Sequence, residues 1–263
     1  MALTFKNLLS YMKKWLQINR KVLIKASVFF VVILCLGAFI NKKPVVSQDD
    51  KVFIQKFLKD WQMEADPLVP HSSFENEVLF LQKIQRKVVS DIKHKVISPE
   101  HFGVVNYYYT NRVGECYDRA VLLEKLMDYF NFKYRHVFIY YVRENGQLKV
   151  TEPGDFLKAK TNSHALLEVK TSRGWMVMDS NTDCLGLSKS NEPMTMSDFR
   201  YLLKNKKPID LKYSPTVGDI SFWVKYPNLK FVYGVYSRKG QFLKPRLPLP
   251  IPSVNFRMLL YNI

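Results

Sequence analysis

The stretch from Gly114 to Phe130 constrains the fold of this chain more than any other. Apolar side chains recur in it at helical spacing, at Ala120, Leu123, Met127 and Phe130. The spacing predicts a buried helix with Cys116 on its first turn. The positive end of a helix dipole favours an ionised, nucleophilic thiol at that place. A small apolar core residue is the alternative interpretation of a lone cysteine there.

Two short strands are predicted further along the chain. Residues 163–169 contain His164 near their start, and residues 175–179 end in Asp179. The Gly-containing turn at 173–174 would join the two strands into a hairpin. A cysteine, a histidine and an aspartate in this order can supply a nucleophile, a base and a group that orients the base. These are the parts that thiol acyl transfer needs.

The surrounding residues form a pattern of four short blocks. They are Gly114, Cys116, Asp118 and Ala120, then Arg135 and Val137, then His164, Ala165, Glu168 and Val169, then Gly174, Trp175 and Asp179. Over roughly residues 74 to 182 the chain resembles the transglutaminase-like superfamily of papain-like cysteine enzymes. The resemblance implies an α+β fold in which the nucleophile helix packs on an antiparallel sheet, with Cys116, His164 and Asp179 as catalytic residues. One departure is Ser180-Asn181-Thr182, where family members often have Pro-Thr.

Acyl transfer also needs donors aimed at the oxyanion, usually a backbone N–H and one side chain. The backbone N–H of Cys116 is the natural first donor. The approach to this residue, 98–113, holds several Tyr and Asn side chains, and Asn111 is predicted as the second donor. A packing or turn role is the alternative for these side chains.

The N-terminal part of the chain predicts a membrane anchor. Residues 22–40 are apolar except for Lys25 and Ser27, and their length suits one crossing of a bilayer. Six basic residues precede the core of this segment and two follow it, so the N-terminus is expected in the cytoplasm and the large domain on the periplasmic or extracellular side. A cleaved signal peptide is the alternative, but no convincing small-x-small site follows.

Charge and cysteine content bear on partners. The net charge is +17, but residues 1–48 contain eight basic and no acidic residues, which leaves +9 for the remainder. Anionic lipid explains this basic excess beside a membrane segment more simply than nucleic acid, so no nucleic-acid partner is expected. Apart from Cys35 in the anchor, Cys116 and Cys184 remain, and a disulfide between them is the main structural alternative for Cys116.

The remaining patterns complete the predicted organisation. Helices are expected at 52–61, 74–92 and 195–203, and strands at 134–142, 147–151 and within 222–236. The predicted layout is a basic tail at 1–21, the anchor at 22–40, a tether at 41–50, a transglutaminase-like catalytic domain at 51–190 and a C-terminal extension of unreadable role at 191–263. His136 is expected to be a core or surface histidine, and no metal site or cofactor is predicted.

The leading functional hypothesis is a membrane-anchored cysteine enzyme that acts on an amide bond of a peptide or protein. The acyl-enzyme on Cys116 would pass to water, as in a protease or amidase, or to an amine, as in a transamidase. The resemblance together with the anchor favours hydrolysis. A non-catalytic envelope scaffold that retains the fold is the hypothesis from another class.

Overall fold

The computed structural model describes residues 20, 22, 24–32, 45–63, 73–144, 147–150, 162–216 and 230–233. The chain divides into two compact units, Met1–Lys42 and Lys43–Ile263. In the first unit, residues 24–32 are helical and most of their apolar side chains are exposed. Within the described ranges, no helix is long and apolar enough to cross a membrane. Residues 33–40 of the predicted anchor lie outside those ranges.

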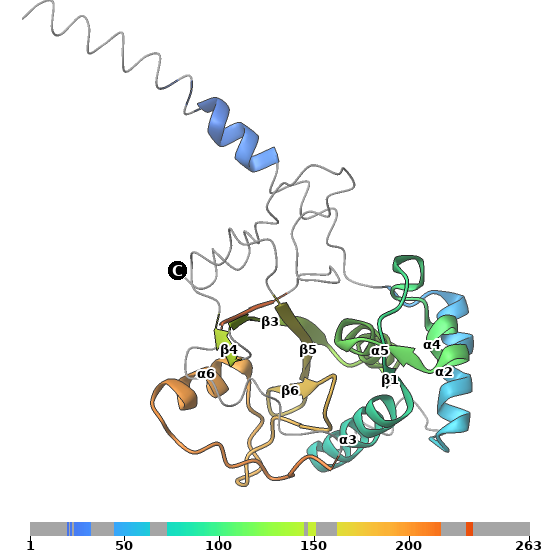
Figure 1. Ribbon diagram of the computed structural model, residues 1–263. Helices are drawn as coiled ribbons and strands as arrows, with labels where there is room; N and C mark the ends of the chain where they lie inside the picture. The colour runs from blue at the N-terminus through green and yellow to red at the C-terminus, as the bar shows by residue number, and fades with distance from the viewer. Residues whose placement is uncertain are drawn as a thin grey trace, which may run out of the picture. The chain divides into compact units, whose positions relative to one another are not determined.

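The second unit contains an antiparallel sheet (Figure 1). Its strands are β3 (Tyr134–Glu144), β4 (Gln147–Val150), β5 (Asn162–Lys170), β6 (Trp175–Asp179) and β7 (Lys230–Tyr233). The order is β4-β3-β5-β6, and β7 also pairs with β3. The predicted β5–β6 hairpin is confirmed, and its register sets Leu166 opposite Asp179.

Five described helices accompany the sheet. They are α2 (Gln48–Asp60), α3 (Phe74–Asp91), α4 (Val105–Asn111), α5 (Cys116–Tyr129) and α6 (Met196–Lys204). A 3-10 turn, η2 (Pro99–His101), precedes α4, and two-residue strands β1 (Lys93–His94) and β2 (Val113–Gly114) pair in parallel. Helix α5 packs on β5 and β3 and contacts α3, while α2 contacts α4. The fold class is α+β, as predicted.

Side-chain caps decide where three helices begin. Ser73 caps α3 by accepting the Asn76 N–H. Thr195 and Asp198 cap α6 reciprocally. Ser47 and Asp50 form the same arrangement at α2, so this helix begins inside the range predicted as a tether.

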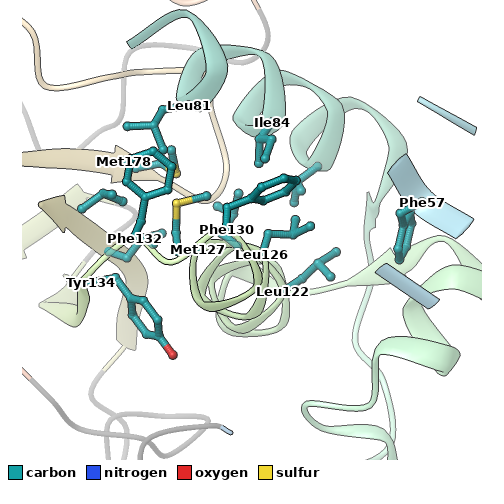
Figure 2. Packing of buried hydrophobic residues seen from close by; sticks show 14 of the residues in the cluster. Phe57, Leu81, Ile84, Leu122, Leu126, Met127, Phe130, Phe132, Tyr134 and Met178 are labelled. Carbon is teal, nitrogen blue, oxygen red and sulfur yellow. The ribbon is translucent and has the colours of Figure 1, made fainter. Parts of the chain in front are cut away.

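The core lies around α5. In Figure 2, Leu122, Leu126 and Met127 of this helix and Phe130, which follows its last residue, pack with Leu81 and Ile84 of α3 and Met178 of β6. A separate cluster joins α6 and β7 to the sheet through Val137, Ile139, Leu166, Phe199 and Phe231. Residues from the range predicted as a C-terminal extension are therefore part of the buried core.

Candidate active site

Cys116 is the first residue of α5 and is partly exposed. The glycine two residues earlier is needed for a close approach, because a Cβ on Gly114 would lie 2.8 Å from the Cβ of Asp118. Asp118 in turn accepts the Glu115 N–H at 2.9 Å, at the N-terminus of the helix. The G-x-C-x-D spacing therefore has a steric and a capping cause, and both fix the start of the helix that carries the thiol.

A hydrogen bond from a buried tyrosine fixes the side chain of Asp118. The Tyr108 hydroxyl donates to Asp118 Oδ1 at 3.2 Å and accepts the Gly103 N–H at 2.7 Å. Burial, followed by the charge of Asp118, raises the pKa of Tyr108, so its hydroxyl keeps its proton and remains a donor. Helix α4 thus supports the first turn of α5.

His164 and Asp179 come together across the β5–β6 hairpin. His164 precedes Leu166 by two residues on the same face of β5, and Leu166 lies opposite Asp179. The imidazole Nε2 lies 2.9 Å from Asp179 Oδ1, and both side chains are buried. This hydrogen bond joins the two residues that were predicted as the base and the group that orients it.

Cys116 lies close enough to the imidazole of His164 for the charge of its sulfur to act on the ring. Because Nε2 faces Asp179, Nδ1 is the ring nitrogen left to exchange a proton with a nucleophile. Burial opposes a charged ring, but the charge and hydrogen bond of Asp179, and then the Cys116 side chain, outweigh it and raise the pKa of His164 to about 10. The structure therefore brings the three predicted residues into one connected group that favours an imidazolium.

Asn111 does not join this group in the described structure. Its side chain is exposed on α4, and its amide donates to the Tyr107 carbonyl at 3.1 Å within the same helix. The following residue, Arg112, takes a left-handed conformation that ends α4 before the chain reaches Cys116. The contacts of Asn111 give no support to the oxyanion role predicted for it.

A scan against protein-family models finds no match to this chain, and a search of curated proteins finds no relative. The site must therefore be interpreted from its own residues.

Two site residues were not predicted from the sequence. Arg119, one helical turn after Cys116, donates to the Ile92 carbonyl at 2.8 Å and to Asn181 Oδ1 at 3.2 Å. Asn181 donates its backbone N–H to Asp179 Oδ1 at 2.8 Å, and its side-chain nitrogen lies 3.5 Å from His164 Nδ1. An arginine within an apolar helical run was the available signal for the first. For Asn181, the sequence offered only its place in a segment that departs from the family pattern.

Hydrogen bonds to its backbone carbonyls hold the segment after β6 in place. The Gln85 side-chain nitrogen, from the buried face of α3, lies 2.8 Å from the Asp179 carbonyl, 3.1 Å from that of Thr182 and 2.9 Å from that of Cys184. The Ser180 hydroxyl donates to the Ala165 carbonyl at 2.6 Å. These bonds hold Asp179 in place without using its carboxylate.

Other residues of the sequence pattern are structural. Glu168 is fully buried and accepts from Arg135 Nε at 2.8 Å, from the Tyr233 hydroxyl at 2.8 Å and from the Met196 N–H at 2.7 Å. The Arg135 guanidinium lies 4.5 Å from the centre of the Trp175 ring. These contacts link strands β3, β5, β6 and β7 to one another and to helix α6.

The remaining cysteine and histidine candidates are buried. Cys184 is a free thiol, as is Cys116, and burial followed by the charges of Asp179 and Asp183 raises the pKa of Cys184, so it stays neutral. His136 is paired with Glu124 in the interior, which fits the core role expected for it. Among the residues that the structure describes, no group of His, Cys, Asp and Glu is arranged to hold a metal ion.

Proposed function

We propose that this protein is a cysteine enzyme that cleaves or transfers amide bonds, built on a papain-like, transglutaminase-like core. One observation carries the proposal: His164 is hydrogen-bonded to Asp179 through Nε2, and the Cys116 side chain lies close enough for its charge to act on the same ring. A nucleophile joined to a base, with the base joined to a third group that orients it, is the arrangement that covalent acyl transfer requires.

The chemistry follows from the three side chains. The Cys116 thiolate attacks the amide carbonyl carbon, and the carbonyl electron pair moves onto oxygen. His164 donates its Nδ1 proton to the leaving nitrogen as the C–N bond breaks, which leaves an acyl-enzyme and a neutral imidazole. Water, or an amine, then attacks the thioester while His164 removes its proton, and the thiolate departs. Asp179 stays ionised throughout and stabilises the imidazolium.

The oxyanion of each tetrahedral intermediate needs preorganised donors. The first N–H groups of a helix have no acceptor within the helix, and the N–H of Cys116 is in this position at the start of α5. This backbone group is the first oxyanion donor in the proposed mechanism.

Hydrolysis is the favoured fate of the acyl-enzyme, and transamidation is the alternative. The proposal includes a membrane anchor at residues 22–40, with the catalytic domain on the periplasmic or extracellular side and a peptide or protein as substrate. A scaffold that retains the fold without activity has less support, because a buried His–Asp pair joined to a partly exposed thiol has no structural purpose that apolar residues would not serve as well.

Labelling with an electrophilic thiol probe tests the proposal. In a Cys35→Ser background, the probe should label the protein and its Cys184→Ala variant, because Cys116 is the accessible, activated thiol. Cys116→Ala should remain unlabelled, and His164→Ala should react far more slowly at pH 6. Equal labelling of the parent protein and His164→Ala would contradict the proposed activation. Once a substrate is found, undiminished turnover by Cys116→Ala would favour the scaffold.

A further inference from the structure

Asn181 contacts both members of the His164–Asp179 pair. Its backbone N–H donates to Asp179 Oδ1, the oxygen that His164 Nε2 also uses. Its side-chain nitrogen lies 3.5 Å from His164 Nδ1, on the other side of the imidazole. A single residue thus contacts the carboxylate that pairs with Nε2 and also lies beside Nδ1.

Arg119 decides which end of the Asn181 amide faces the imidazole. A guanidinium can only donate, so the amide atom 3.2 Å from Arg119 is the oxygen, and the NH₂ group is turned toward His164. Arg119 is anchored in turn on the Ile92 carbonyl at the C-terminal end of α3. The partial negative charge of that helix end suits a buried cation.

On the basis of the proposed function, we infer that Arg119 and Asn181 are positioning residues that control proton release from His164 Nδ1. The physical reason is the equilibrium between the imidazolium and the neutral imidazole of His164. Asp179 and Cys116 both stabilise the imidazolium, and a ring stabilised in its charged form releases its Nδ1 proton reluctantly to the leaving amine.

Asn181 stabilises the neutral imidazole that forms once the proton has left Nδ1. When the proton moves from Nδ1 to the leaving nitrogen, the vacated lone pair of Nδ1 can accept the Asn181 N–H, while Nε2–H still donates to Asp179. In the imidazolium the same Asn181 N–H faces an Nδ1–H donor and gains nothing. The charged and titratable groups that act on His164 are Asp179 from β6 and Cys116 from α5. Arg119 acts on both of these groups from the next turn of α5.

The test is the titration of His164 in the full-length chain, followed by ¹H–¹⁵N NMR of ¹⁵N-histidine-labelled protein. The His164→Gln spectrum assigns the signal among the five histidines of the chain. Asn181→Ala should shift the protonation equilibrium about three- to tenfold toward the imidazolium, which corresponds to losing one hydrogen bond made to the neutral ring. Asn111→Ala is the matched control, because it removes an exposed side-chain amide from α4. It should not change the titration of His164.

Arg119→Lys tests the link between the two residues. It keeps the charge beside Cys116 and Asp179 but loses the planar fork that reaches Ile92 and Asn181 together. Its shift should have the same direction as that of Asn181→Ala, and the double variant should shift no further than Asn181→Ala alone.

An unchanged titration in Asn181→Ala, a shift toward the neutral ring, or additive shifts in the double variant would overturn the inference. The titration needs no substrate, so this result is separable from failure of the proposed function, which probe labelling at Cys116 reports. Far-UV circular dichroism of each variant confirms that the compared proteins are folded.

Discussion

At the scale of single residues, His164 is the centre of the site. Its ring is buried, yet it is held between a carboxylate and a thiol that favour its charged form. Asp179 is used twice, through Oδ1 toward His164 and through its carbonyl toward Gln85. The carboxylate can therefore be changed without releasing the backbone that carries it.

Asp179→Asn should retain the fold and measurable activity, because the side chain is nearly isosteric and Gln85 still holds the backbone. Turnover should fall on the order of 10⁴-fold, since an amide stabilises the imidazolium poorly and permits the wrong tautomer. Cys116→Ala should eliminate acyl-enzyme formation altogether. Acyl-enzyme trapping followed by mass spectrometry distinguishes the two variants, and a trapped adduct on Cys116→Ala would refute the assignment of the nucleophile.

The titration of His164 predicts a particular dependence of stability on pH. Its pKa is raised from 6.5 to about 10, so the folded state holds a proton that the unfolded state releases between these values. The stabilisation is complete below about pH 6.5 and declines as the pH rises toward 10. Urea unfolding at several pH values should show this decline in the parent protein and a flatter profile in His164→Gln. Parallel profiles would contradict it.

The grouping of Cys116, His164 and Asp179 could be predicted from the sequence because each lies in a short block with its own local signal. Cys116 begins an apolar helix, and His164 and Asp179 lie on one hairpin. Arg119 and Asn181 could not be assigned in this way. Their contacts join the end of α3, the first turns of α5 and the segment after β6, and no local pattern contains all three.

At the scale of elements, the start of α5 determines where the thiol lies. The chain passes Gly114 in close contact with Asp118, and Asp118 is supported by Tyr108 of α4. The preceding strand β2 pairs with β1, so the entry to the helix is fixed by backbone pairing as well. Small changes here are expected to move Cys116 relative to His164.

Gly114→Ala should destabilise the protein by about 1–3 kcal/mol, the usual cost of forcing an extra methyl group into a packed site. Its Cβ would meet that of Asp118 at 2.8 Å, so the first turn of α5 must shift. Denaturant unfolding measures the stability, and probe labelling should slow as well. Ser90→Ala, at an exposed position of α3, is the control and should change neither.

Element type was predictable where the apolar periodicity or the turn was clear, as in α3, α5, α6 and the β5–β6 hairpin. The start of α2 was not. Asp50 is buried because it pairs with Lys125 at 2.7 Å, a residue 75 positions later in the chain. A charged residue ahead of the apolar run carries no local sign of that partner, so the sequence favoured a tether there.

At the scale of the whole molecule, the sheet depends on residues that follow the proposed triad in the sequence. β7 pairs with β3, and both Tyr233 and Met196 donate to the buried carboxylate of Glu168. The second core cluster includes Phe199 of α6 and Phe231 of β7. No role could be predicted for this region from its sequence, because the contacts that bury Phe199 and Phe231 include strands distant in the chain.

A chain that ends at Ser190 should therefore fail to fold cooperatively. It would expose apolar side chains of β3 and β5 and leave Glu168 with fewer donors, each an unfavourable change for a buried carboxylate. A chain that begins at Lys43 retains the second compact unit and should unfold cooperatively. Thermal unfolding followed by circular dichroism checks both, and a cooperative transition in the chain ending at Ser190 would contradict the prediction.

The asymmetry of charge around residues 22–40 makes a prediction about topology. Protease added outside spheroplasts should digest the chain beyond residue 40 and spare the N-terminal tail, because the basic flank stays in the cytoplasm. Immunoblotting with tags at either end measures this, with disrupted spheroplasts as the control for protease access. Protection of the large domain in intact spheroplasts would reverse the proposed orientation.

The hydrogen bonds from Gln85 to three backbone carbonyls near the end of β6 affect how a mutational screen of this protein would be interpreted. Gln85 lies 94 residues before Asp179 in sequence and contributes no group to the proposed chemistry. Replacing its NH₂ by the oxygen of glutamate would set an acceptor against three acceptors and displace Asp179. In a mutational screen scored by activity alone, position 85 would therefore rank with the triad. Only a parallel measurement of protein abundance would separate a residue that holds the site from those that perform the reaction.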